Sequence, residues 1–553
     1  MTRSRLLLVA FILSFCSFCY ELVMAKTLVD LTGRAILWQS ITIGVYIAAL
    51  GLGSLWSSRI RYTRSALFSI ELMLSVAGAL SVILILVFHM IYRVISVDQL
   101  LTMMHASDVL EINPGLISSA RYWPFVWFLV GAELMVFFIG FLSGFEIPLL
   151  LRIAEKREVG LNQLLGFHYL GVLLASLLFS FLFLPWLSLP LIAVLVASGN
   201  ALVCVLFLSQ NWVKVRKSRM LLMGLMMLIV AAGWLVSTPV NDWQKKIFYY
   251  YRPNLLFDPV KKKDFFQLMT QFPEVSQIRT LYQKIDLVWS HELWGGAQFT
   301  LYLDGHFQFS TLNEKFYHEG MAHVPIEVTR KVPKNVLVLG AGDGNLLREL
   351  VEYKDIQHIT QVELDPVMVT LANQPLLTDI NQHSMSDSRI ELHLEDAFYY
   401  LRNNAQTFDA IYIDFPYPFT ADIARLYSVE FFESLMTHLD ADGFAVMDMP
   451  LYHQQLVDSK PELEQVNSVL FSTLDAAGLL VEPYEVMEET FVLLRKNDTP
   501  LTWKMHGPRS RYQGLNEDIF RDMRDYDYPH ELDKEFVNSV FHPKLMNLDD
   551  STF

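Results

Sequence analysis

Apolar residues in the first part of the chain fall into long runs, whereas the later part has shorter apolar segments between polar ones. The runs cover residues 7–24, 36–55, 66–92, 122–150, 164–184, 188–209 and 219–236. A helix needs about 20 apolar residues to cross a bilayer, so residues 1–240 are predicted to form a polytopic membrane domain of about seven helices. More runs follow the first one, which is therefore predicted to be a spanning helix and not a cleaved signal peptide.

Basic residues lie in alternate connections between these runs. They precede the first run and follow the second, fourth and sixth: Arg3, Arg5, Arg59, Arg61, Arg64, Arg152, Lys156, Arg157, Lys214, Arg216, Lys217 and Arg219. The positive-inside rule places these connections in the cytoplasm and predicts a multi-pass protein of the cell (inner) membrane, in contact with the lipid bilayer.

The number of spans conflicts with the side on which the rest of the chain is expected. A cytoplasmic start and seven spans would put it outside, yet basic residues after the last run, including Lys261–Lys263, favour a cytoplasmic catalytic domain. The run 122–150 is interrupted by glycines and a proline, and it could be re-entrant or contain two spans. Whether the number of spans is odd or even therefore stays open.

Four glutamates lie within or at the ends of the apolar runs: Glu21, Glu71, Glu133 and Glu146. Acids are costly in a bilayer and mark functional positions by default. Two interpretations stay open. The glutamates line a polar cavity or substrate path, or they lie at interfaces and form hydrogen bonds inside the helix bundle.

From about residue 240 the pattern is that of a water-soluble protein. Residues 241–277 are predicted to form a connecting segment with a short amphipathic helix, and residues 278–330 a small β-rich domain. The elements expected in this domain are strands at 281–287, 297–303 and 306–309, a hairpin turn at Asp304-Gly305, and a helix at 313–324.

Residues 331–499 alternate between short apolar runs and helical patterns. The predicted strands are 336–339, 358–364, 390–395, 409–414 and 443–448. This alternation predicts a mostly parallel sheet with helices on both faces, a Rossmann-like α/β domain of the methyltransferase type. Residues 500–553 form a polar, acidic and aromatic C-terminal extension, to which we assign no chemistry.

The stretch from Asn335 to Asp365 has the order strand, glycine turn, helix, strand, acid. Gly340 and Gly342 let the backbone approach a bound nucleoside closely. Glu363 follows about 20 residues later, which is the spacing of an acid that binds ribose hydroxyls. The stretch therefore predicts a nucleoside-binding site.

Acids end three of the predicted strands: Glu363, Asp396 and Asp414. Ligands of open α/β sheets bind outside the carboxyl ends of the strands, so the three carboxylates are expected to converge on one crevice. A single acid in such a place is often only a helix cap. Helix capping alone does not explain three acids beside a glycine turn.

The composition narrows the class of ligand. With 58 acidic and 43 basic residues, the formal net charge is −15, which argues against nucleic acid as a partner because phosphate binding needs a basic surface. The same charge is compatible with small cationic substrates. Cys16 and Cys19 have no further ligands beside them and are interpreted as apolar core residues, so no metal site is predicted.

Several motifs in the second half of the chain together resemble the spermidine synthases, the polyamine aminopropyltransferases. They are YQKIDL, LYLDGHFQFSTLNEKFYHEGMAHVP, VLVLGAGDGNLLREL, QVELDP, LEDAF, FDAIYIDF and LYSVEFFESL, and they lie within residues 278–450. The multi-span front half is similar to the membrane-fused bacterial members of that family. The resemblance leaves a homodimer open.

The resemblance implies a reaction in which an amine of putrescine attacks the propylamine carbon of decarboxylated S-adenosylmethionine. Spermidine and methylthioadenosine are the expected products. The donor is a sulfonium that already carries a leaving group, so the resemblance implies a co-substrate but neither a cofactor nor a metal. The nucleophile must be a neutral amine, although alkylamines are protonated near pH 7, so a carboxylate must orient the amine and take up its proton.

The resemblance also implies roles for individual residues. Asp414 would be the catalytic base, Glu363 would hold the ribose, and Asp396 would reach the adenine amino group. Asp343 would face the cationic aminopropyl end and would repel the α-carboxylate of ordinary S-adenosylmethionine. The implied donor-binding residues are Gln283, Gly340, Gly342, Asp343, Glu363, Asp396 and Ala397. The implied acceptor-binding residues are Tyr317, His318, Gln308, Asp343, Asp414 and Tyr417.

One departure from the family pattern concerns the acceptor. The loop after the fourth strand usually carries two acids, but here it reads Asp414-Phe415-Pro416-Tyr417-Pro418, so Tyr417 stands in place of the second acid. The identity of the acceptor amine is therefore open, and Glu488 and Glu489 are candidates for replacement charge. Two alternatives remain: a methyltransferase that uses intact S-adenosylmethionine, and a non-catalytic polyamine sensor or transporter.

Overall fold

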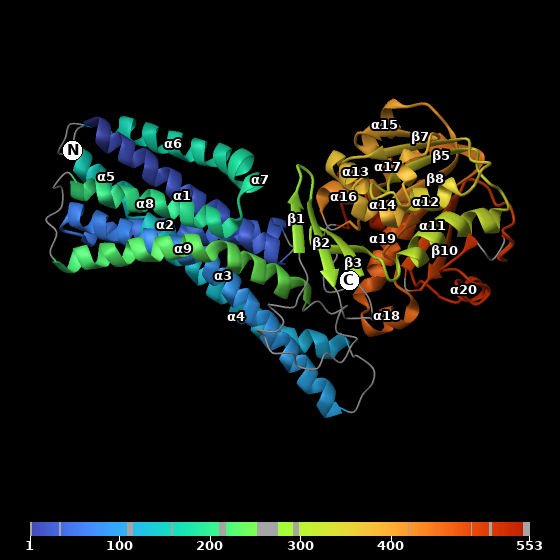
Figure 1. The fold of residues 1–553 in the computed structure, drawn as a ribbon, viewed down its shortest axis with the longest axis horizontal. Helices are drawn as coiled ribbons and strands as arrows, with labels where there is room; N and C mark the ends of the chain where they lie inside the picture. Colours follow the sequence, from blue (N-terminus) through green and yellow to red (C-terminus); the bar gives the residue numbers. More distant parts are fainter. Residues whose placement is uncertain are drawn as a thin grey trace. The chain divides into compact units, whose positions relative to one another are not determined.

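A computed structural model describes most of the chain as two compact units (Figure 1). The described residues are 3–32, 35–107, 114–155, 159–209, 217–250, 275–290, 298–418, 420–487, 489–507 and 511–545. Chain contacts divide the protein into Met1–Ser276 and Gln277–Phe553. The amphipathic helix expected at 261–272 lies outside the described residues.

The first unit is entirely helical over its described residues. Its helices are α1 (Arg3–Thr32), α2 (Ala35–Trp56), η1 (Ser57–Arg59), α3 (Thr63–Ser107), α4 (Pro114–Ser143), α5 (Glu146–Glu155), α6 (Leu161–Leu178), η2 (Phe179–Phe183), α7 (Leu184–Trp186), α8 (Leu189–Ser209) and α9 (Lys217–Tyr250). Seven helical stretches in the described part are long and apolar enough to cross a membrane, in agreement with the seven apolar runs.

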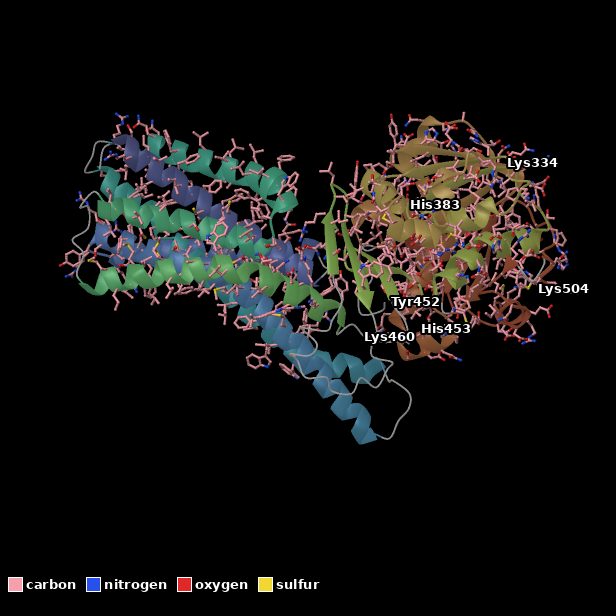
Figure 2. The ribbon with its side chains drawn as sticks, viewed as in Figure 1. Lys334, His383, Tyr452, His453, Lys460 and Lys504 are labelled. Carbon is pink, nitrogen blue, oxygen red and sulfur yellow. The ribbon has the colours of Figure 1, made fainter. Side chains whose placement is uncertain are left out.

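The outer surface of the helical unit is apolar. Figure 2 shows outward-pointing side chains of the long helices that are mostly carbon, whereas many side chains of the second unit end in nitrogen or oxygen. Leu55, Phe181 and Leu235 are exposed over 76%, 76% and 79% of their surface. Exposed leucines and phenylalanines in such numbers are typical of helices that face lipid.

The 122–150 run, suspected of being irregular, is broken at Gly144, whereas Gly131 and Gly140 lie inside α4. Helix α4 ends at Ser143, and α5 begins at Glu146. A Cβ on Gly144 would lie 2.2 Å from the carbonyl oxygen of Leu50 in α2, so only glycine allows this approach. The break between α4 and α5 therefore coincides with close packing against α2.

Two of the acids within the apolar helices, Glu71 and Glu133, take part in hydrogen bonds inside the bundle. Glu71 of α3 is fully buried and accepts a hydrogen bond from Asn200 Nδ2 of α8 at 2.7 Å. Asn200 accepts in turn from the Tyr20 hydroxyl of α1 at 2.9 Å. Glu133 accepts from the Thr42 hydroxyl at 2.9 Å. These contacts support the interpretation of bundle hydrogen bonds for two of the four glutamates.

The second unit begins with a small antiparallel sheet in the order β1-β2-β3-β4. Its strands are β1 (Val275–Arg279), β2 (Lys284–Ser290), β3 (Gln298–Leu303) and β4 (His306–Ser310), and α11 (Glu314–Thr329) follows. The strand expected at 281–287 begins only at Lys284, because the residues before it form the turn that joins it to β1. Strand β1 was not predicted.

The main sheet has seven strands in the order β10-β11-β9-β8-β5-β6-β7. They are β5 (Asn335–Gly340), β6 (His358–Glu363), β7 (Ile390–Leu394), β8 (Phe408–Asp414), β9 (Leu439–Asp448), β10 (Leu480–Val486) and β11 (Glu489–Arg495). Strands β5 to β9 are parallel to one another, and the β10–β11 hairpin, which was not predicted, pairs antiparallel with β9 and adds an antiparallel edge. The described second unit thus has the predicted Rossmann-like fold.

Helices cover both faces of this sheet. The remaining helical elements are α12 (Asn345–Val351), α13 (Pro366–Ala372), α14 (Pro375–Asn381), η4 (Ser384–Ser386), α15 (Ala397–Asn403), α16 (Ala421–Ala424), η5 (Arg425–Tyr427), α17 (Val429–His438), α18 (Gln454–Ser459), α19 (Glu462–Ala476), α20 (Glu517–Asp522) and η7 (Lys534–Phe536). Leu337 and Leu339 pack in one core with α15, α17 and α19, whereas Val336 and Val338 pack in another with α11 and α12. Burial on both faces explains the continuous apolar run of β5.

Candidate active site

The glycine turn after β5 brings three strand ends close together. Gly340 has a φ of +88°, and a Cβ there would lie 2.1 Å from the carbonyl oxygen of Asp414, its partner in the β5–β8 register. A Cβ on Gly342 would lie 2.7 Å from a carboxylate oxygen of Glu363 at the end of β6. Both positions therefore need glycine, because any side chain would push the neighbouring acid away.

The acid predicted to hold the ribose is fixed by its own loop. Glu363 Oε1 accepts a hydrogen bond from the Asp365 amide at 2.8 Å. The side chain of Asp365 caps α13, because its Oδ1 accepts from the Val367 amide at 3.0 Å. Burial raises the pKa of Glu363 to about 7, against the lowering effect of the amide bonds. Gln283, from the turn between β1 and β2, donates to Asp365 Oδ2 at 3.0 Å and so lies in the same neighbourhood.

A network of charges links α11, α12 and the glycine turn. His318 Nδ1 lies 2.9 Å from Glu314 Oε2, and Arg348 Nη2 donates to the same oxygen at 2.8 Å. Burial would lower the pKa of His318, but the bond to Glu314 and the nearby Asp343 carboxylate raise it. A protonated His318 partly balances Asp343, whose pKa is raised by burial. Asp343 itself accepts from the Asn345 amide at 2.8 Å.

The predicted base is held by a phenol. The Tyr317 hydroxyl of α11 donates to Asp414 Oδ1 at 2.8 Å. Burial raises the pKa of Asp414 to about 6, the Asp343 carboxylate acts in the same direction, and His318 and the phenol oppose them. The carboxylate is thus mostly ionised at pH 7 and has a pKa suited to take up a proton near neutrality.

The residue that stands in place of the second loop acid contacts a different acid. The Tyr417 hydroxyl donates to Asp448 Oδ1 at 3.1 Å. Asp448 is the last residue of β9 and is 7% exposed. Burial raises the pKa of Asp448, and the Glu489 carboxylate at the start of β11 raises it further. One buried acid, Asp448, and one half-buried acid, Glu489, therefore lie near Tyr417.

The predicted adenine ligand has a protein partner in this structure. Asp396 Oδ2 accepts from Arg425 Nη2, and Oδ1 accepts from Arg425 Nη1 at 3.2 Å and from the Tyr399 amide at 2.9 Å. Burial favours a higher pKa for Asp396, but the bonds from Arg425 and the backbone outweigh it and lower the pKa. Ala397 is buried at the first position of α15. Asp396 thus caps a helix, and its adenine role stays a prediction.

Gln308 is not joined to these residues by a hydrogen bond. Its side-chain nitrogen donates to the carbonyl oxygen of Phe307, next to it in β4, at 3.0 Å. Its predicted place in the acceptor pocket stays a prediction.

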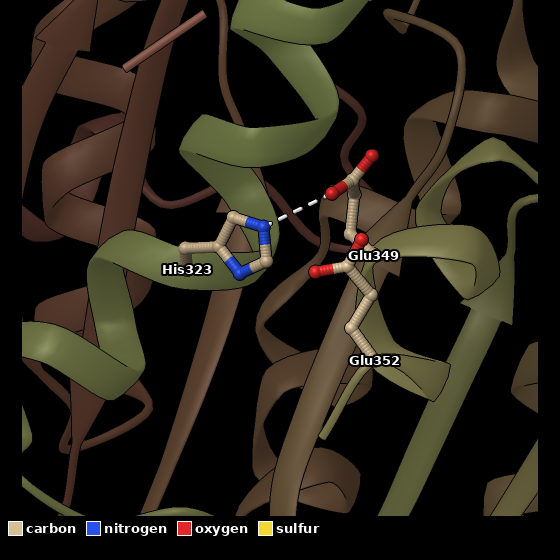
Figure 3. Close-up of side chains that lie close together, drawn as sticks. All are labelled: His323, Glu349 and Glu352. Carbon is tan, nitrogen blue, oxygen red and sulfur yellow. Dashed lines mark hydrogen bonds and ion pairs between the residues drawn. The ribbon is translucent and has the colours of Figure 1, made fainter. Parts of the chain in front are cut away.

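One cluster among the described residues has the spacing of metal ligands (Figure 3). It consists of His323, Glu349 and Glu352, whose ligand atoms lie within 4.8 Å of one another. However, His323 Nε2 lies 3.0 Å from Glu349, and Nδ1 lies 2.9 Å from the Tyr353 hydroxyl. Because both ring nitrogens already have protein partners, we assign the cluster a structural role.

Sequence reasoning missed several residues of the site. Glu314 and Arg348 are buried ion-pair partners, and Asp448 is a fourth acid at a strand end. The rule that selected Asp396 and Asp414 would also have selected Asp448, since it ends the fifth predicted strand. The i,i+4 spacing of Glu314 and His318 was also visible in the sequence. No local signal pairs Asp396 with Arg425, because their contact depends on the fold of the loop after β8.

Comparison with known proteins identifies the family to which the chain is similar. The model of the "Spermine/spermidine synthase domain" family matches residues 314–501. A polyamine aminopropyltransferase of Aquifex aeolicus is 31% identical over 494 residues, which is 88% of this chain and 86% of that protein. One of Corynebacterium efficiens is 30% identical over 486 residues, which is 85% of this chain and 80% of that protein.

Among solved structures, the spermidine synthase of Thermotoga maritima matches 45% of this chain and 84% of its own, with 20% identity and a TM-score of 0.36. The curated relatives extend well into the helical unit, because they cover more than four fifths of the chain. Identity of this extent shows that the chain belongs to the polyamine aminopropyltransferase family and is an enzyme that transfers an aminopropyl group.

Proposed function

We propose that this enzyme transfers the aminopropyl group of decarboxylated S-adenosylmethionine to putrescine and releases spermidine and methylthioadenosine. The observation that carries the proposal is the Tyr317–Asp414 pair, held next to the glycine turn of a nucleoside site. A carboxylate with a pKa of about 6 can accept the proton that a neutral amine must lose when it becomes the product.

The donor is assigned to the ends of β5, β6 and β7. Glu363 holds the ribose hydroxyls, and Gln283 supports this region through Asp365. Asp343, partly balanced by His318, faces the ammonium of the aminopropyl chain. An acid at this position repels the α-carboxylate of ordinary S-adenosylmethionine, so the donor must be the decarboxylated form.

Asp396 and Ala397 are assigned to the adenine ring. Asp396 already accepts from Arg425 and from the start of α15, so it has to share its oxygens between these donors and the adenine amino group. A carboxylate has about four acceptor positions, which makes this sharing feasible.

The acceptor amine approaches from the side of α11 and β8. Its nitrogen lone pair forms the new C–N bond as the C–S bond breaks. The electron pair of the C–S bond stays on sulfur, which becomes the neutral thioether of methylthioadenosine. The proton lost from nitrogen passes to Asp414, which Tyr317 keeps oriented. His318 and Gln308 line the acceptor side.

The test is an assay of the purified full-length protein. It is incubated with decarboxylated or intact S-adenosylmethionine and with putrescine, cadaverine or spermidine, and the nucleoside product is identified by mass. We expect methylthioadenosine with putrescine, and a loss of at least 100-fold in Asp414→Asn, the scale of general-base catalysis. Asp409→Asn, at the opposite end of β8, is the matched control. Formation of S-adenosylhomocysteine, or binding without turnover, would overturn the proposal.

We further propose that residues 1–240 span the cell membrane and that the domains follow the boundaries predicted from the sequence. The seven apolar helices found among the described residues and their apolar surface support the membrane position. A cytosolic donor requires a cytoplasmic catalytic domain. A reporter fused after Phe553 should therefore be active in the cytoplasm, and an extracytoplasmic signal would contradict the assignment.

A further inference from the structure

Asp448 is placed next to the predicted base by the register of the sheet. Strands β8 and β9 are parallel, and Ile413 pairs with Met447, so Asp414 and Asp448 take the next pair of positions at the carboxyl edge. Asp448 also pairs with Phe491 of β11. The ring centroids of Tyr317 and Phe491 are 5.3 Å apart. The phenol that contacts Asp414 therefore lies on the same face of the sheet as Phe491.

The surroundings of Asp448 are negative. Burial and the Glu489 and Asp414 carboxylates raise the pKa of Asp448, whereas hydrogen bonds from Tyr417 and Tyr317 lower it. A buried carboxylate is costly unless a cation or hydrogen bonds compensate it. The Tyr417 hydroxyl supplies one hydrogen bond but no charge. In the part of the chain that the structure describes, no basic side chain forms an ion pair with Asp448, so the ammonium group of a substrate can supply the missing positive charge.

We propose that Asp448 is the second ammonium-binding group of the acceptor pocket. It binds the amine of a diamine that does not react, while Asp414 serves the amine that attacks. Tyr417 is a positioning residue that orients the Asp448 carboxylate, and Glu489 adds negative potential. This inference rests on the proposed aminopropyl transfer to a diamine. It assigns to β9 the charge that the loop after β8 lacks.

The proposal makes acceptor selectivity depend on Asp448. A diamine gains a charge-assisted contact that a monoamine of the same length cannot make. Asp448 belongs to the acceptor side only, since the acids assigned to the donor end other strands. Its loss should therefore raise the KM for the diamine and leave the KM for the donor unchanged.

The experiment compares putrescine with butylamine, which has the same carbon chain and only one amine. We measure kcat/KM for both acceptors, at saturating decarboxylated S-adenosylmethionine, in wild type, Asp448→Asn and Asp442→Asn. Asp442 lies near the start of β9, is exposed, and provides the matched loss of one charge. We expect the wild type and Asp442→Asn to prefer putrescine, and Asp448→Asn to lose roughly 10- to 100-fold of this preference.

A second variant tests whether the lost preference comes from the lost charge and not from misfolding. Tyr417→Asp combined with Asp448→Asn returns the acid to the loop, and we expect it to recover part of the preference for putrescine. A preference that is the same in Asp448→Asn and wild type would overturn the inference, even though the enzyme is active. A wild type that makes no methylthioadenosine with any amine would instead overturn the proposed function. The two failures are thus distinguishable.

Discussion

The hydrogen bond from Tyr317 to Asp414 should set the pH at which the enzyme loses activity in acid. Its length is 2.8 Å, and it stabilises the ionised carboxylate. In Tyr317→Phe the ring remains but the donor is gone. Hydrogen bonds to charged groups contribute about 1.5–3 kcal/mol, and one pKa unit corresponds to about 1.36 kcal/mol. The substitution should therefore raise the pKa of Asp414 by roughly one to two units.

The sign of the effect follows from the role of the base. Asp414 accepts a proton only when it is ionised, so activity falls as the pH drops through its pKa, which is about 6 in the free protein. A higher pKa moves this loss to higher pH. The acidic limb of kcat/KM for putrescine should thus lie one to two units higher in Tyr317→Phe than in wild type.

The assay is initial-rate formation of methylthioadenosine between pH 5 and about 9.5, at saturating donor. The ratio of variant to wild-type kcat/KM cancels the titration of putrescine itself, which is the same in both series. Tyr412→Phe is the control, because its hydroxyl contacts the Ala322 carbonyl oxygen and not the site. A ratio that is constant with pH would refute the reasoning, whatever its absolute value.

Three further changes probe the donor side and the buried ion pairs. Gly342→Ala places a Cβ 2.7 Å from a Glu363 oxygen, so the KM for the donor should rise roughly tenfold or more, with an unchanged acceptor KM in the same rate assay. Arg348→Met removes the buried guanidinium that pairs with Glu314 and Glu349 and should lower the stability by about 3–5 kcal/mol, measured by urea unfolding in detergent; an unchanged midpoint would contradict this. Asp396→Asn keeps a helix-capping side chain, so the stability should change by less than about 1 kcal/mol, while the donor KM rises if the carboxylate meets adenine.

The sequence predicted best those elements whose residues are buried on both sides. The strand expected at 409–414 is β8 (Phe408–Asp414), and the one expected at 336–339 is β5 (Asn335–Gly340). Their continuous apolar runs leave few alternatives. The β10–β11 hairpin was missed because β10, LVEPYEV, is a polar edge strand with a proline inside it. Its pairing with β11, the next strand along the chain, makes it a strand.

The site was predictable where a strand end or a glycine determines the geometry, and not where a loop does. Gly342 and Glu363 could be paired from spacing alone, and the structure brings them together. The bond between Asp396 and Arg425 depends on how the loop after β8 folds back, which no periodicity reveals. Asp448 also obeys the strand-end rule, but the predicted candidates for the missing charge were Glu488 and Glu489.

The order of the strands suggests why an acid can move from a loop to β9 without loss of the site. Along the carboxyl edge, neighbouring strands are about 4.8 Å apart and run β9, β8, β5, β6, β7. Asp448, Asp414, the glycine turn, Glu363 and Asp396 follow these strands in that order. The proposed substrate groups have the same order: distal ammonium, attacking amine, aminopropyl chain, ribose, adenine. A carboxylate at the end of β9 therefore lies at the acceptor end of the row, and any acid there can serve the distal ammonium. Substitutions should accordingly change acceptor kinetics at the β9 end and donor kinetics at the β7 end, with the bond change between β8 and β5.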